Sequence, residues 1–167
     1  RLTPQQQLML KVASVIGRIF AFRILRDIYP IEADKGDLAD SLNTLQSLDI
    51  TRLETPEPDL AYIFKHIITQ EVTYNLMLFA QRQQLHRAIA EWYERAHRAD
   101  LSPYYTLLAH HWGIAGDAIQ AIDYLEKAGD QALRSGAYRE AAGFFTGALE
   151  MDKEQEARSE RPRRGRW

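Results

Sequence analysis

The sequence predicts a mainly α-helical protein that carries one small β-hairpin. Apolar residues recur every three or four positions through most of the chain, which is the period of an amphipathic helix. A turn rich in proline and acidic residues, Thr55 to Asp59, separates two short apolar runs, as in a hairpin. Beyond this hairpin the pattern is helical throughout, and breaks that contain glycine divide it into separate helices.

The first part of the chain has the element order of a winged-helix domain, namely three helices followed by a hairpin. The first helix begins at Thr3-Pro4, a cap followed by proline, and stops at Gly17. The second spans about Ala21 to Ile28 and ends before a proline. The third opens at Gly36 or Asp37 and carries leucines at helical spacing. The hairpin strands follow over Ile50–Leu53 and Leu60–Phe64. We therefore expect a winged-helix domain over residues 1–80.

The helical pattern over the second part of the chain, residues 81–152, predicts antiparallel TPR-like α-helical repeats. Helices are expected over residues 81–99, 101–112, 118–133 and 138–151, after a helix over residues 69–77 that precedes this part. The last two share a pattern about twenty residues apart, in which Gly116, Ala121, Leu125 and Ala128 correspond to Gly136, Ala141, Phe145 and Ala148. Small residues at fixed spacing let neighbouring helices approach closely, as in stacked helix pairs.

From about Lys153 the helical periodicity ends. Residues 161–167 contain four arginines, one proline and one glycine. This composition predicts a disordered, solvated basic tail over residues 153–167, with a phosphate-binding arm as the alternative.

Composition excludes several classes of protein. The formal net charge is −2, so no global field attracts the chain to nucleic acid or to an anionic membrane. The sequence has no cysteine, which excludes disulfides and cysteine-based zinc sites and fits a reducing, cytoplasmic compartment. No stretch is long and apolar enough to span a bilayer, so we expect no membrane contact. The chain begins at Arg1 without a Met, from which we expect a segment of a longer protein.

The sequence shows no constellation for catalysis or for metal binding. It lacks the glycine-rich phosphate loop, the dinucleotide-binding fingerprint and the serine elbow of hydrolases. The adjacent His110 and His111 point about 100° apart on a helix, and His86 and His97 lie about 16 Å apart along one. We therefore expect no catalytic residue, no metal site and no cofactor on this chain, and packing roles for these histidines.

The charge of the third helix argues against DNA as a partner. This helix would read the duplex in a DNA-binding winged helix, and it should then be basic. Asp34, Asp37, Asp40 and Asp49 instead lie in or beside it, against the single Lys35. A DNA duplex would repel this surface, so we expect the domain to pack against protein.

A lone histidine, His66, lies where the Leu60–Phe64 strand ends and the next helix begins. After it, Ile67, Ile68, Val72, Leu76 and Phe79 fall on one helical face. A ring at this junction is near the free N–H groups of a helix start. His66 can therefore contact a ligand, or it can cap the helix or bond to the hairpin backbone.

Four short motifs follow one another along the chain. They are Leu10-x-x-Ala-Ser-Val-Ile-Gly-Arg-x-Phe20, Phe64-x-His-x-x-x-x-Glu-Val-x-Tyr74, Arg82-x-x-Leu-His-x-x-Ile-Ala90 and Leu108-Ala-His-His-Trp112. Together, over about Leu2 to Asp152, they resemble the segment after the ATPase module in signalling proteins of the STAND class. The chain is similar in this to multidomain adenylate/guanylate cyclases and to LuxR-like or kinase-linked regulators, in which a predicted AAA-type ATPase precedes TPR-like repeats. The basic tail has no counterpart in this pattern.

The resemblance implies a non-catalytic regulatory and protein-interaction segment of a signal-transduction ATPase. In STAND ATPases, a winged-helix histidine at this junction can touch the β-phosphate of bound ADP and hold the inactive state. His66 has that place, although Ile67 stands where plant and animal versions carry an acidic residue, and Lys65 is a second nucleotide-sensing candidate. ADP or ATP would be held by an upstream ATPase module and not by this chain.

The partners that the resemblance implies are another protein or neighbouring domains of the same polypeptide. Two other functions remain open at this point. One is a stand-alone TPR-like scaffold, and the other is a winged-helix transcription regulator that binds DNA.

Overall fold

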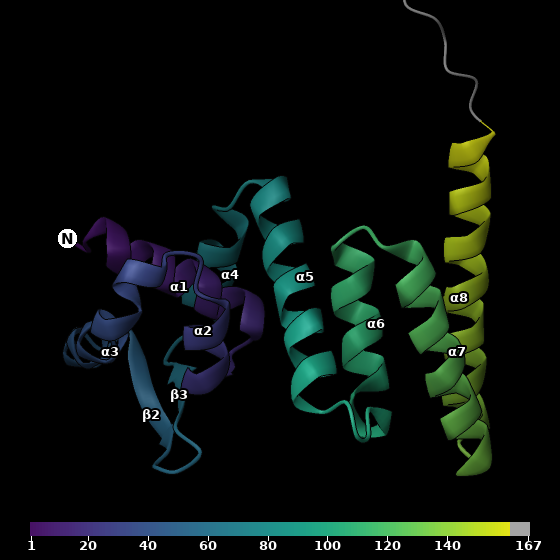
Figure 1. Cartoon of the computed structure of the whole chain (residues 1–167), viewed down its shortest axis with the longest axis horizontal. Helices are drawn as coiled ribbons and strands as arrows, with labels where there is room; N and C mark the ends of the chain where they lie inside the picture. The colour runs from purple at the N-terminus through teal and green to yellow at the C-terminus, as the bar shows by residue number, and fades with distance from the viewer. Residues whose placement is uncertain (161–167) are drawn as a thin grey trace, which may run out of the picture. The chain divides into compact units, whose positions relative to one another are not determined.

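The computed structural model describes residues 1–160 and confirms that the chain is mainly helical (Figure 1). Within these residues it has eight α-helices, two short 3-10 helices and three β-strands. The chain divides into two compact units, Arg1–Trp92 and Tyr93–Trp167. The division falls inside one helix, whereas the sequence analysis placed the change of domain at residues 80 and 81.

The first unit contains five helices, one 3-10 helix and the strands. They are α1 (Pro4–Ile16), β1 (Ile19–Ala21), α2 (Phe22–Ile28), η1 (Glu32–Asp37), α3 (Leu38–Ser47), β2 (Thr51–Thr55), β3 (Ala61–Phe64), α4 (Ile67–Asn75) and most of α5 (Phe79–Ala96). The second unit contains the end of α5 and the elements that follow it. They are η2 (Ser102–Tyr104), α6 (Tyr105–Ile114), α7 (Ala118–Arg134) and α8 (Tyr138–Ser159).

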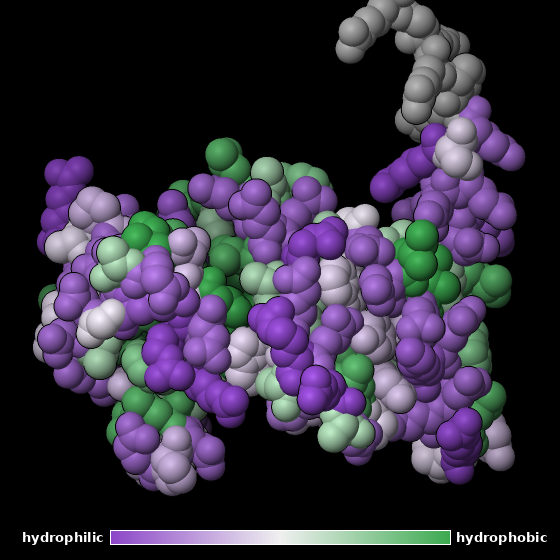
Figure 2. All heavy atoms as spheres, in the orientation of Figure 1, coloured by the Kyte–Doolittle hydropathy of each residue, from purple (hydrophilic) through white to green (hydrophobic). Residues whose placement is uncertain are grey.

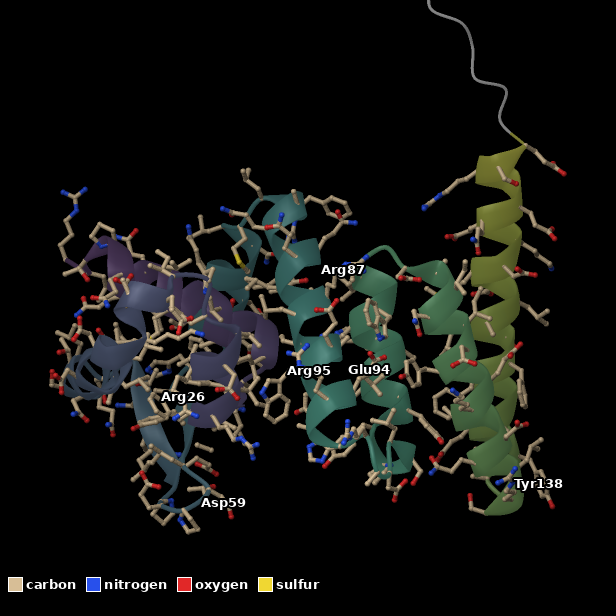
Figure 3. All side chains as sticks on the ribbon, viewed as in Figure 1. Arg26, Asp59, Arg87, Glu94, Arg95 and Tyr138 are labelled. Atoms are coloured by element: carbon tan, nitrogen blue, oxygen red, sulfur yellow. The ribbon has the colours of Figure 1, made fainter. Side chains whose placement is uncertain are left out.

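The strands form an antiparallel sheet in the order β1-β3-β2. Strands β2 and β3 are the expected hairpin, and Asp59 marks the turn between them (Figure 3). Every residue of the central strand β3 is buried, which fits its apolar sequence. Strand β1 was not predicted, since three residues are too few to show the alternation that identifies a strand.

The core of the first unit forms around the aromatic residues of this sheet. The Phe20 ring on β1 is completely buried, and its centroid lies 5.4 Å from that of Phe64 and 6.0 Å from that of Tyr62. Leucines of α3 and apolar residues of α1 complete this core, as their helical spacing predicted. The predicted start of α1 is also confirmed, because the side chains of Thr3 and Gln6 each accept the other's backbone N–H.

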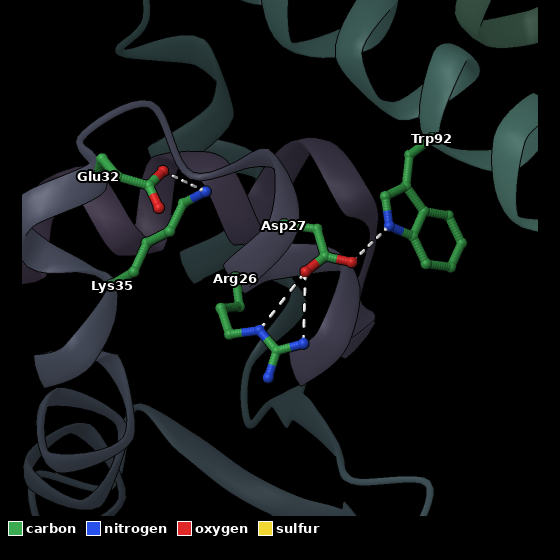
Figure 4. A network of polar contacts seen from close by, with 5 residues as sticks. All are labelled: Arg26, Asp27, Glu32, Lys35 and Trp92. Carbon is green, nitrogen blue, oxygen red and sulfur yellow. Dashed lines mark hydrogen bonds and ion pairs between the residues drawn. The ribbon is translucent and has the colours of Figure 1, made fainter.

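A polar network joins α2 to α5 within the first unit (Figure 4). The indole N–H of Trp92 donates to an Asp27 carboxylate oxygen at 2.9 Å, and the Arg26 guanidinium contacts the other oxygen at 3.4 Å. The Arg23 guanidinium lies 5.5 Å from the centre of the Trp92 ring. The buried indole N–H is therefore satisfied by a charged acceptor.

In the second unit, the two helices that precede the repeated glycines end in the same way. Gly116 and Gly136 follow α6 and α7 with φ values of 84° and 80°, the left-handed conformation that glycine adopts without strain. The same two capping hydrogen bonds form at the end of each helix. The second of them joins the Asp117 N–H to the Trp112 carbonyl after α6, and the Ala137 N–H to the Ala132 carbonyl after α7. The predicted small residues at the helix contacts are all buried: Ala121, Ala128, Ala141 and Ala148.

A carboxylate provides the polar contact that joins three helices of the second unit. One oxygen of Glu94 (Figure 3) accepts the indole N–H of Trp112 at 2.9 Å and the hydroxyl of Tyr124 at 2.6 Å. Burial and this bond to a negative group raise the pKa of Tyr124 well above its ordinary value. Each donor on α6 and α7 is thus tied to α5.

Helix α8 extends further than the sequence predicted. It continues to Ser159, whereas the prediction ended the helix at Met151 and began a disordered tail at Lys153. Residues 153–159 lack an apolar face, but Glu, Lys, Gln, Ala and Arg favour a helix without one. The rest of the predicted basic tail, residues 161–167, lies outside the described residues. No helix among residues 1–160 is both long and apolar enough to cross a membrane.

We expect Gly129→Ala to destabilise the contact between α7 and α8. An added methyl group would lie 2.6 Å from a ring carbon of Phe145, so the ring must move. The free energy of unfolding should fall by about 1 kcal/mol or more in urea, despite the higher helix propensity of alanine. Gly143→Ala on α8 is the control, since no atom lies within 4 Å of its added methyl group. An equal effect of both changes would contradict this packing.

Stability should decline above pH 10 in a way that depends on Tyr124. Its pKa is higher in the folded state, so unfolding releases a proton there, and stability is lost as pH rises past the unfolded value of about 10. Tyr124→Phe should lower the free energy of unfolding at pH 7 by about 1.5–3 kcal/mol, because the bond to a carboxylate is lost. It should also flatten the decline between pH 9 and 11. Tyr138→Phe, at a side chain 71% exposed, should change neither quantity.

Candidate functional site

Helix α4 directs its apolar face outward. Ile68, Val72 and Leu76 follow one another at four-residue spacing, and they are 68%, 51% and 70% exposed. Of the nine residues of α4, all of which the structure describes, none is buried. Ile67 before this row and Phe79 after it are exposed as well, and Figure 2 shows apolar surface where α4 leads into α5. The helical face found in the sequence therefore lies on the surface of the first unit.

Polar side chains hold α4 in place from its opposite face. The Gln70 amide donates to the carbonyl of Ser14 on α1 at 3.1 Å. The Tyr74 hydroxyl is 2.9 Å from the ring nitrogen Nε2 of His86 on α5. The Arg82 guanidinium lies over the Tyr74 ring, 5.2 Å from its centre. Helix α4 is thus attached by hydrogen bonds and ring contacts, with its apolar residues on the other side.

These contacts give a structural role to residues of two of the four sequence motifs. Tyr74 ends the motif that contains His66, while Arg82 and His86 belong to the motif that follows it, so the two meet in space. His86 is only 2% exposed. The sequence analysis did not assign these residues to a contact. A usable signal was present, because Gln70 with Tyr74 and Arg82 with His86 are both four residues apart, a spacing that places each pair on one helical face.

His66 lies at the start of α4 with its side chain exposed. Its backbone is extended, with φ −118° and ψ 128°, and its carbonyl accepts the N–H of Thr69 at 3.0 Å. The imidazole makes no capping hydrogen bond with the described residues of α4, so it does not have the helix-capping role left open above. An exposed imidazole beside the free N–H groups of a helix start can donate to an anion.

Lys65, the second candidate, is engaged elsewhere. Its ammonium group forms an ion pair with the carboxylate of Asp49, which precedes β2 and has a φ of 64°. Its backbone N–H donates to the carbonyl of Ile50 at 3.0 Å. The Lys65 ammonium is therefore engaged by Asp49, and Lys65 helps to fix the end of the hairpin.

Two of the remaining three histidines are packed. His111 is 4% exposed, whereas His110 is on the surface, so the expected packing role does not extend to His110. His97 packs with Tyr104, with ring centroids 4.3 Å apart, and with Tyr93.

Tyr74→Phe should weaken the attachment of α4. The change removes the hydroxyl that bonds to the buried His86 while it keeps the aromatic ring. We expect a loss of about 1–2 kcal/mol in the free energy of unfolding, measured by urea denaturation. Tyr138→Phe, at an exposed hydroxyl, serves as the matched control. Equal stability of the two variants would show that this hydrogen bond does not hold the helix.

No protein-family model matches this chain, and no solved structure matches it. The chain is similar to uncharacterized protein R02095 of Rhizobium meliloti (strain 1021), with 30% identity over 152 residues. The match covers 84% of this chain but 14% of that protein. The similarity therefore concerns one segment of a much longer polypeptide.

Proposed function

We propose that this chain is a non-catalytic regulatory and protein-interaction segment of a STAND-type signalling ATPase. In this proposal the first unit is a winged-helix arm that follows the nucleotide state of an ATPase module. The TPR-like helices of the second unit contact a partner or an effector domain, such as a nucleotide cyclase, in the same cytoplasmic polypeptide.

The element order supports both parts of the proposal. The order of elements α1-β1-α2-α3-β2-β3, with the hairpin at the end, matches the order expected of a winged-helix domain. In the second unit, α6 and α7 end in the same glycine cap and pack on the next helix through small residues, as helix pairs in a solenoid do. The chain itself carries no phosphate loop, so a nucleotide would have to be bound by another module.

The outward apolar face of α4 is the observation that carries the proposal. Contiguous exposed apolar residues mark surfaces that contact another protein. This face begins at Ile67, directly after the exposed His66. A module that covers it would therefore bring its own surface, and a nucleotide bound there, next to the imidazole.

The free energy gained by covering this face is large enough to switch the domain between a docked and a released state. Covering Ile68, Val72 and Leu76, which are half or more exposed, would release on the order of 4 kcal/mol. That changes an equilibrium between docked and released states about a thousandfold. A hydrogen bond from His66 to a phosphate would make docking depend on which nucleotide is bound.

Two other functions predict different behaviour. A DNA-binding regulator would read the duplex with α3, but residues 38–47 include no basic residue, and Asp37 and Asp40 are exposed. A stand-alone scaffold would use α6 to α8 and would leave the face of α4 without a role. We therefore favour the regulatory segment.

Substitutions at the start of α4 in the full-length protein test the proposal. His66→Ala should weaken ADP binding about tenfold or more and raise basal activity, because a hydrogen bond to a charged phosphate is lost. Ile68→Asp should also raise basal activity, since the docked state is destabilised. Both residues are exposed, so thermal stability should change little. Leu53→Asp, at an exposed leucine on β2, is the matched control and should leave activity unchanged.

Two results would contradict the proposal. One is unchanged nucleotide control in both His66→Ala and Ile68→Asp. The other is micromolar binding of ADP or ATP to this 167-residue chain on its own, measured by calorimetry.

A further inference from the structure

Two adjoining cavities lie in the first unit between α1 and the start of α5. The larger has a volume of about 480 Å³ and is lined by Leu8 and Lys11 of α1 and by Leu85 and Ala88 of α5, with Ile28 and Met77 between them. The smaller has a volume of about 290 Å³ and continues toward Leu10 and Leu76. Gln7 and Lys11 line both cavities, so the two meet at these side chains. Small-molecule sites have volumes and mostly apolar linings of this kind.

One charge lies at the junction of the cavities. Among the described lining residues, Lys11 is the single ionisable one. It is half-buried, and it forms no ion pair with residues 1–160. The other polar groups are the amides of Gln7, Gln81 and Gln84 and the hydroxyl of Thr73, which carry no charge. A lysine among apolar lining residues is complementary to a single negative charge on an apolar molecule.

We propose that these cavities bind an amphiphilic monocarboxylate. Its carboxylate pairs with the Lys11 ammonium, and its alkyl chain lies along Leu8, Ile28 and Leu85 in the larger cavity. A single cation balances a carboxylate, whereas a phosphate head group would keep a second charge unpaired beside apolar residues. The larger cavity includes none of Ile68, Val72 and Leu76, although the smaller one reaches Leu76, and binding there does not depend on the proposed signalling role.

A volume of about 480 Å³ lies within the range of small-molecule sites, and an extended alkyl chain can lie along its apolar lining residues.

Calorimetric titration of the 167-residue chain with dodecanoate, below its micellar concentration, tests the proposal. We expect saturable binding at one site, and binding of dodecanol about tenfold weaker, because it lacks the charge. Lys11→Gln should weaken dodecanoate binding about tenfold and leave dodecanol binding unchanged. Ala88→Phe, which places a ring in the larger cavity, should abolish both. Lys153→Gln, at an exposed lysine of α8, is the matched control and should bind as the unchanged protein does.

Several outcomes would overturn the assignment. Equal binding of dodecanoate and dodecanol, or an equal effect of Lys11→Gln and Lys153→Gln, would show that Lys11 does not recognise a carboxylate. Tighter binding of dodecyl phosphate would assign the site to a phosphate head group. Absence of saturable binding, together with a dimer that Ala88→Phe disrupts, would assign the groove to a second copy of the chain. Thermal unfolding of each variant verifies that it is folded.

Discussion

The hydrogen bond between Tyr74 and His86 is the interaction on which the candidate site depends. No residue of α4 is fully buried, and Ile68 and Val72 are exposed, so these apolar side chains do not set which way the helix faces. The Tyr74 hydroxyl reaches Nε2 of the buried His86 only if Tyr74 points inward, and the Tyr74 ring also carries the Arg82 guanidinium. With Tyr74 and Gln70 turned toward the protein, Ile68 and Val72 are turned away from it. Polar groups thus set an orientation that apolar groups set in most surface helices.

Most of the fold could be predicted because local signals determine its helix limits. Thr3 and Gly17 bound α1, and Gly116 and Gly136 end α6 and α7 in conformations that neighbouring residues specify. Strand β1 could not be predicted, because a three-residue strand is defined by its pairing with β3, more than forty positions away in the sequence. The end of α8 was missed for a different reason, since helix propensity without apolar periodicity left no pattern to read.

The candidate site was predictable in position but not in arrangement. The change from strand to helix period located His66 and the row of apolar residues after it. The sequence could not show that this row faces outward, because the choice depends on the Ser14 carbonyl and the His86 ring, which belong to other helices. It also could not show that Asp49 forms an ion pair with the ammonium group of Lys65. In both cases the partner is distant in sequence, and only the folded chain brings it near.

The way α4 is attached separates its local opening from the stability of the unit as a whole. Phe20, Phe64 and the leucines of α3 stabilise a core to which α4 contributes no buried side chain. Local opening of α4 therefore requires the loss of a few polar contacts, while the sheet and the other helices stay folded. Selection for a more stable core would therefore not slow such an opening. The rate of this movement can change through the contacts of α4 while the packing of the core stays the same.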